Sequence, residues 1–168
     1  MIAASGATLH LDAEVSSVAD GIVTCADGRT IASRVVISCL PLNALASIGF
    51  TPELAAPKRR AIHTGHGGRS IKLWLKVKGV QPGILASGGP GGLRWLFAER
   101  EARDGTTLIV GFALTDGTLD PGDRQSIAPS LARFFPEAEL IAWDWHDWVG
   151  DRFARGTWVA LPADAAWI

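Results

Sequence analysis

The sequence contains no tyrosine, one methionine and two cysteines among 168 residues. Cys25 and Cys39 are too few for a disulfide framework, and neither belongs to a CxxC motif or a zinc-ligand spacing. We therefore expect free thiols in a reducing compartment, which favours the cytoplasm. No apolar run reaches transmembrane length, and no basic stretch precedes a signal-like apolar core, so no membrane association is expected.

An excess of charge of one sign is also missing. The formal net charge is −1, and residues 58–60 ("KRR") form the one basic cluster. A nucleic-acid-binding face needs a broader basic surface, so no nucleic-acid partner is expected. Hydrophobic residues make up 48% of the sequence and charged residues 20%, which is typical of one globular domain or of a large fragment of a bigger protein.

Several short strands are indicated in the first part of the chain. Residues 22–25 and 30–31 flank Asp27-Gly28, a pair typical of a tight hairpin turn. The run 34–40 ("RVVISCL") is apolar at successive positions, so we expect a strand buried on both faces. Pro41 ends it, because proline cannot donate to a strand ladder. In the region after Pro41, Pro52 and Pro57 are expected to break the chain into short helical turns and loops.

The second part of the chain has the stronger patterns. Residues 71–77 alternate strictly between apolar and polar side chains, which predicts a half-buried strand. Residues 93–100, 106–114 and 139–145 are also expected to be strands. Apolar side chains at helical spacing predict one main helix over residues 123–135. The predicted fold class is α+β, with a mixed, mostly antiparallel sheet.

Three features have the composition of reactive or metal-binding sites. Lys72 lies on the polar face of the 71–77 strand, where it is either a solvated lysine or a lysine directed into a pocket. His63 and His66 have a short spacing but no cluster of acidic residues nearby, so no metal site is expected. His146 lies near two aspartates, but no GxSxG motif supports a nucleophile triad.

The glycine clusters "GHGGRS" and "GGPGGLR" are interpreted as turns. Neither completes GxGxxG or GK[ST], and neither lies between a strand and a helix, as a phosphate-binding loop requires.

The segment 144–158 ("DWHDWVGDRFARGTW") holds three of the seven tryptophans. These rings either fill a core or line a flat pocket. The intervening glycines and charges are poor core residues and favour a loop that positions the rings. The tail 156–162 has a composition compatible with a last short strand.

Four stretches resemble, in order, the flavin-dependent monoamine oxidase family: "RVVISCLPLNALASIGFTPEL", "GHGGRSIKLWLKV", "LIVGFAL" and "DWVGDRFARGTW". The resemblance covers most of the chain from about Val15 onward. It lacks the N-terminal GxGxxG segment and the C-terminal FAD segment of that family. The resemblance implies that the chain has three parts. Residues 1–60 would be strands and a link of an FAD-binding domain, and residues 61–145 would be a substrate-binding sheet and helix. Residues 146–168 would be an aromatic loop that returns toward the flavin site.

The resemblance also implies residue roles. Lys72 would hold a water at the flavin N5, and Trp158 would form one aromatic wall of the substrate cage. The implied cofactor contacts are Val15, Cys39, Pro41, Trp148 and Thr157. Thr157 stands where covalent members of the family carry the flavin-linked cysteine, so FAD is expected to bind non-covalently.

The implied reaction is oxidation of a small-molecule amine to an imine with production of hydrogen peroxide. The missing segments imply that the isolated chain is inactive and that it pairs with a missing N-terminal half or with itself. Two alternatives stay open. One is a non-enzymatic α+β binding or interaction module, and the other is a related flavoprotein of the desaturase or protoporphyrinogen-oxidase type.

Overall fold

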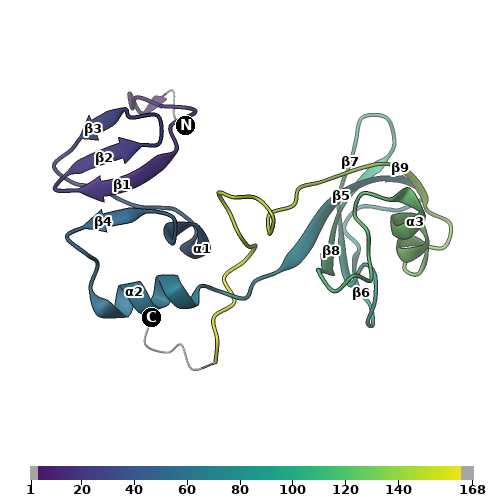
Figure 1. The fold of residues 1–168 in the computed structure, drawn as a ribbon. Coiled ribbons are helices and arrows are strands. Elements are labelled where there is room, and N and C mark those ends of the chain that lie inside the picture. Colours follow the sequence, from purple (N-terminus) through teal and green to yellow (C-terminus); the bar gives the residue numbers. More distant parts are fainter. Residues whose placement is uncertain (1–3, 164–168) are drawn as a thin grey trace. The chain divides into compact units, whose positions relative to one another are not determined.

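A computed structural model describes residues 4–163. The chain divides into two compact units (Figure 1). The first comprises Met1–His66 and Leu161–Ile168, and the second comprises Gly67–Ala160. No helix in the described part of the chain is both long and apolar enough to cross a membrane.

The first unit contains a small sheet and two helices. Its strands are β1 (Val15–Ala19), β2 (Ile22–Cys25), β3 (Thr30–Ala32) and β4 (Gly49–Thr51), in the order β3-β2-β1-β4. The β1–β4 pair is parallel and the other two pairs are antiparallel. The predicted hairpin at Asp27-Gly28 is confirmed, with Gly28 at φ +88°. The helices are α1 (Leu42–Leu45) and α2 (Ala56–Thr64).

The second unit is a five-stranded antiparallel sheet with one helix. The strands are β5 (Ser70–Lys78), β6 (Leu85–Ser87), β7 (Trp95–Glu101), β8 (Thr107–Leu114) and β9 (Glu139–Trp145), in the order β6-β7-β8-β5-β9. The helix is α3 (Arg124–Ala132), which Asp123 caps by accepting a hydrogen bond from the Gln125 N–H. Figure 1 shows α3 beside this sheet.

The hydrophobic core lies in the second unit, between the sheet and α3. Ile71, Leu73, Leu75 and Val77 of β5 are buried, as the alternating pattern predicts. They belong to one cluster with side chains of the neighbouring strands and of α3: Leu96, Ile109, Ile127 and Leu131. One face of the sheet is therefore closed by the helix, and the alternate side chains occupy its opposite, open face.

The first prediction that the structure contradicts concerns residues 34–40. This run forms no strand, and all seven residues are exposed. The sequence pattern specifies a strand buried on both faces, but no strand among the described residues pairs with it.

Two further predictions differ from the structure. The region after Pro41 holds a nine-residue helix, α2, as long as the main helix α3. Pro57 lies in the first turn of α2, where a missing N–H breaks no helical bond, so it does not end the helix. The tail 156–162 is irregular rather than a strand.

Candidate functional site

The open face of the second unit's sheet carries Lys72 beside aromatic rings. Lys72 of β5 stands directly opposite Phe112 of β8, and Phe112 stands opposite Trp95 of β7. Residues opposite one another in a ladder project to the same face. Antiparallel pairing across three strands thus brings a lysine, a phenylalanine and a tryptophan into one row.

This row extends into a continuous line of rings. The Trp95 and Phe112 centroids are 4.9 Å apart, and Phe97 lies 6.4 Å from Trp95 at the outer end. Trp158 packs on the other side of Phe112, at 5.1 Å with an interplanar angle of 52°. These separations lie in the range of favourable aromatic contacts. We call Phe97, Trp95, Phe112 and Trp158 the aromatic row.

Lys72 and Trp158 therefore both adjoin Phe112, although they are 86 positions apart in the sequence. The Lys72 side chain is half-buried, and its Nζ lies 5.6 Å from the centroid of the Trp74 ring. A ring face attracts an ammonium group electrostatically. Among residues 4–163 no carboxylate forms an ion pair with Lys72, so its charge remains available to a ligand or a water.

Trp158 belongs to the loop that follows β9. The Thr157 N–H donates to the Gly68 carbonyl at 2.9 Å, which ties the end of the loop to the chain just before β5. The Gly156 N–H donates to the Trp148 carbonyl at 3.0 Å and closes the loop on itself. These two bonds explain why Trp158, although 53% exposed, reaches the aromatic row.

A histidine and an aspartate stabilise the middle of this loop. His146 Nε2 lies 2.7 Å from Asp151 Oδ2, and the His146 ring lies edge-on at 4.3 Å from the Trp148 ring. The Phe153 N–H donates to Asp151 Oδ1 at 2.7 Å. This backbone hydrogen bond, followed by the one with His146, lowers the pKa of Asp151 below 3.8, because both favour the carboxylate.

The side-chain hydroxyl of Thr157 has no hydrogen-bond partner among the described residues. Its Oγ1 is buried, and no described residue bonds to it. A buried polar atom without a partner costs about 1–3 kcal/mol, so a ligand atom that bonds to this hydroxyl would recover that energy. A buried hydroxyl next to the aromatic row fits a flat ring that carries hydrogen-bonding atoms, as a flavin does.

The remaining predicted cofactor contacts lie in the first unit. Val15 begins β1 opposite Cys25 and is half-buried. Cys39 and Pro41 are exposed, one in the irregular run and the other just before α1. The sequence-predicted site residues thus fall into two sets, and the second unit holds Lys72, Trp148, Thr157 and Trp158.

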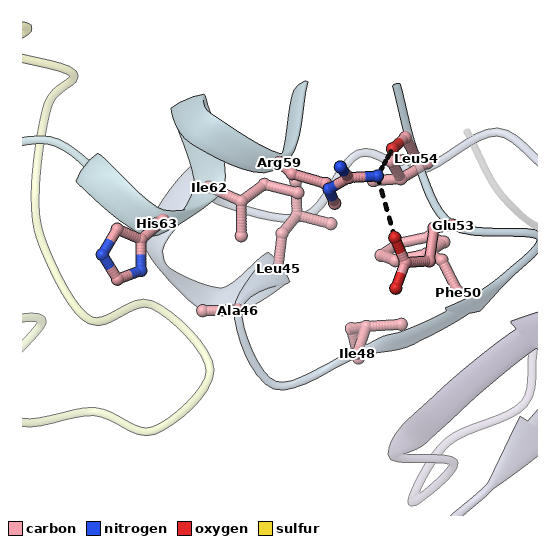
Figure 2. A pocket seen from close by; sticks show the side chains of 9 residues that line it. All are labelled: Leu45, Ala46, Ile48, Phe50, Glu53, Leu54, Arg59, Ile62 and His63. Carbon is pink, nitrogen blue, oxygen red and sulfur yellow. Dashed lines mark hydrogen bonds and ion pairs between the residues drawn. The ribbon is translucent and has the colours of Figure 1, made fainter. Parts of the chain in front are cut away.

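The first unit also contains a pocket of about 340 Å³, shown in Figure 2. Its apolar lining comes from α1, α2 and the region of β4, and the Arg59 guanidinium forms an ion pair with Glu53 at 2.9 Å at one side. The lining residues are Leu45, Ala46, Ile48, Phe50, Glu53, Leu54, Arg59, Ile62 and His63. None of the predicted site residues lines it. The "FTPEL" stretch, which is part of the first resembling motif, supplies three of the lining residues.

Sequence reasoning also missed Trp95 and Phe112. Both occupy open-face positions of alternating strands, which is the signal that could have indicated them. Within residues 4–163 no three His, Cys, Asp or Glu side chains cluster closely enough to hold a metal ion.

The chain is an α+β protein whose second unit carries the aromatic row beside Lys72. The sequence of the chain matches the model of the flavin containing amine oxidoreductase family over residues 1–167. The chain therefore belongs to this family, whose cofactor is FAD, and the resemblance noted from its motifs is confirmed.

Two curated relatives are named for nicotine compounds. The chain is 34% identical over 138 residues to (S)-6-hydroxynicotine oxidase of Paenarthrobacter nicotinovorans, covering 82% of this chain and 32% of the relative. It is 30% identical over 166 residues to nicotine dehydrogenase of Pseudomonas putida, covering 95% of this chain and 34% of the relative. The chain thus spans about a third of the length of these relatives.

Solved structures share the fold. A putrescine oxidase bound to putrescine superposes with a TM-score of 0.72 at 21% identity, over 94% of this chain and 39% of that one. The expected α+β fold with mostly antiparallel sheets is confirmed as part of a flavin amine oxidase fold.

Proposed function

We propose that this chain is the substrate-binding part of an FAD-dependent amine oxidase that converts an amine to an imine and produces hydrogen peroxide. The observation that carries the proposal is the meeting of Lys72 and Trp158 at Phe112 on the open face of the sheet. Family membership supports the oxidoreductase class.

The residues of the second unit have distinct proposed roles. The aromatic row holds the body of the substrate and excludes water from it. Trp158 supplies a ring face that attracts the amine nitrogen. Lys72 holds a water next to the flavin through its ammonium N–H donors. The chemistry that bound FAD supplies is hydride removal from the carbon next to the amine nitrogen, followed by reoxidation with oxygen.

The proposed cofactor contacts are Trp148 and Thr157 in the second unit and Val15, Cys39 and Pro41 in the first. Thr157 has a hydroxyl rather than a thiol, so FAD is held non-covalently, and the unpartnered Oγ1 supports a polar contact there. The free thiols of Cys25 and Cys39 support a reducing compartment such as the cytoplasm.

The proposed substrate is a small-molecule amine. The names of two relatives point to nicotine-type amines, and a structural neighbour binds putrescine. An aromatic row suits a flat ring beside the nitrogen better than a linear diamine, because its rings offer stacking surfaces.

A spectroscopic experiment tests the proposal. The purified chain is mixed with FAD, alone and together with the segments that flank the matched region of (S)-6-hydroxynicotine oxidase. We expect little flavin binding by the chain alone. With the added segments we expect a visible flavin band that an amine bleaches without oxygen. A complex that assembles but retains no flavin would leave the non-enzymatic binding module as the better explanation.

The role of Lys72 is tested separately in the assembled enzyme. Lys72→Met should slow reoxidation of the reduced flavin at least about ten-fold, with a smaller effect on substrate Kd. Lys78→Met is the matched control, because Lys78 projects from the same strand at its far end and is 60% exposed. Equal effects of Lys72→Met on reoxidation and on Kd contradict the water-holding role.

A further inference from the structure

The loop that follows β9, residues 146–158, turns about Asp151, and we call it the tryptophan loop. The Asp151 carbonyl accepts the N–H groups of Ala154 at 3.2 Å and of Arg155 at 2.8 Å. The Asp151 carboxylate accepts the Phe153 N–H through Oδ1 at 2.7 Å. Asp151 therefore determines the shape of the second half of the tryptophan loop.

His146 connects Asp151 to the sheet. His146 directly follows β9, which ends at Trp145, and its Nε2 lies 2.7 Å from Asp151 Oδ2. The Phe153 N–H, and then His146, lower the pKa of Asp151, so its carboxylate is ionised at neutral pH and can only accept hydrogen bonds. The His146 Nε2 therefore carries a proton and donates it. This one hydrogen bond ties the centre of the tryptophan loop to the end of a strand that pairs with β5.

A path of contacts leads from His146 to the aromatic row. The His146 ring lies edge-on at 4.3 Å from the Trp148 ring. The Trp148 carbonyl accepts the Gly156 N–H at 3.0 Å. Gly156 lies two residues before Trp158, whose ring centroid is 5.1 Å from that of Phe112. A change at His146 can therefore reach Trp158 without a direct contact between the two side chains.

The turn just before Gly156 depends on this support. Arg155 has φ +53°, in the left-handed region that residues with a side chain rarely adopt. Such a conformation persists only where the surrounding structure holds it, and the bond from the Arg155 N–H to the Asp151 carbonyl does so here. Loss of the Asp151 contacts should let this turn relax and change the direction in which the chain enters Trp158.

Two backbone hydrogen bonds hold Trp158 independently of His146. The Thr157 N–H donates to the Gly68 carbonyl at 2.9 Å, and the Gly67 N–H donates to the Ala160 carbonyl at 2.9 Å. Because these bonds lie on both sides of Trp158, breaking the His146–Asp151 bond should displace the ring rather than detach the tryptophan loop.

We propose that His146 and Asp151 are positioning residues, whose hydrogen bond holds the Trp158 ring against Phe112 and thereby sets the affinity of the aromatic row for the ring of a bound substrate. Neither side chain needs to touch substrate or cofactor to do this. The position of the Trp158 ring is a property of the chain itself, whereas the effect on affinity rests on the proposed function.

Two amide variants of His146 test the hydrogen bond. His146→Gln places an amide N–H about where the imidazole Nε2 lies, whereas His146→Asn is one methylene shorter and does not reach Asp151. Both keep a polar group at a side chain that is 53% exposed, so both should fold, which circular dichroism checks. His10→Ala is the control, because it removes an exposed histidine from the other unit. Should His146→Asn not fold, His146→Ala takes its place.

Fluorine NMR of the complete chain labelled with fluorotryptophan reports the position of the Trp158 ring. Its signal is the one that disappears in Trp158→Phe. We expect His146→Asn to shift this signal and to increase its change between H2O and D2O, because the ring becomes more exposed. His146→Gln and His10→Ala should resemble the wild type. Phe112→Leu should move the Trp158 signal in the wild type and much less in the His146→Asn background, where the two rings are already apart.

Amine binding tests the consequence for the site. In the enzyme assembled with the flanking segments of (S)-6-hydroxynicotine oxidase, His146→Asn should raise the amine Kd about two- to ten-fold, the equivalent of one ring contact. The rate of flavin reduction at saturating amine should stay within about two-fold of the wild type, because His146 takes no part in the chemistry. His146→Gln should restore the wild-type Kd.

The two measurements separate this proposal from the proposed function. A Trp158 signal that is the same in His146→Asn and the wild type overturns the positioning role. Equal displacement by His146→Gln and His146→Asn also overturns it, because the hydrogen bond would then not be the cause. A displaced Trp158 signal with an unchanged amine Kd refutes the link to affinity, and with it the place of Trp158 in the substrate site.

Discussion

The packing of Trp158 on Phe112 is the contact on which the proposed ligand-binding face depends, and its energy can be measured directly. The perturbation is a double-mutant cycle of Phe112→Leu and Trp158→Leu, alone and combined. Leucine keeps much of the apolar volume and removes the ring–ring contact. The cycle then isolates the energy of that contact from the general cost of each substitution.

The geometry sets the expected magnitude. The centroids are 5.1 Å apart and the rings are tilted by 52°, which lies in the range where aromatic pairs contribute about 0.5–1.5 kcal/mol beyond their area burial. Trp158 is 53% exposed, so water competes on one side. We therefore expect a coupling energy in the lower half of that range, about 0.5–1 kcal/mol.

The assay is urea unfolding at equilibrium, followed by far-ultraviolet circular dichroism because a tryptophan is being removed. The matched control pairs Phe112→Leu with Trp145→Leu. Trp145 stands opposite Leu73 and has no ring contact with Phe112, so these two changes should add to within about 0.5 kcal/mol. If the unfolding free-energy changes of Phe112→Leu and Trp158→Leu also add, the two rings do not interact. Trp158 would then not belong to the aromatic row, and the loop would not close on the sheet.

Three other predictions concern the scaffold. Leu75→Ala removes a fully buried side chain of β5 and should lower the free energy of unfolding by about 2–5 kcal/mol in urea titration; a loss below about 1 kcal/mol contradicts the described core. Gly92→Ala should cost about 1–3 kcal/mol, because Gly92 has φ +63° and its new Cβ would lie 2.2 Å from Ser130 Oγ; an unchanged midpoint argues against this turn. Asp151 has a pKa held below 3.8, first by the Phe153 N–H, so its contribution is present above pH 3.8 and is lost as pH falls through its folded pKa. The difference in free energy of unfolding between the wild type and Asp151→Asn, measured by urea titration, should therefore shrink as the pH is lowered. A difference that grows on acidification would contradict a lowered pKa of Asp151.

Local patterns predicted the second unit well because its elements are determined by their own periodicity. Residues 71–77 alternate strictly, and β5 covers Ser70–Lys78 with its apolar face buried. The helix predicted over 123–135 is found as α3. Strict alternation leaves a strand only one way to face a core, so the sequence determines both the element and its orientation.

The site was predictable only in part, because it depends on strand pairing between distant residues. Lys72 and Trp158 were singled out by their motifs. Phe112 connects them because of the register between β5 and β8 and because the loop after β9 returns to the sheet. A single sequence specifies neither of these. Thr157 likewise has its place in the motif, whereas its unpartnered hydroxyl is a property of the folded environment.

The apolar segment at residues 35–40 shows why a pattern can be read correctly and still predict the wrong local structure. Its composition specifies a strand covered on both faces, yet a strand forms only where a neighbour accepts its backbone hydrogen bonds and removes its side chains from water. A helix such as α3 satisfies its own backbone, so its sequence is sufficient to form it once one face is buried. Residues 35–40 lack both conditions within residues 4–163, and they therefore form no strand there.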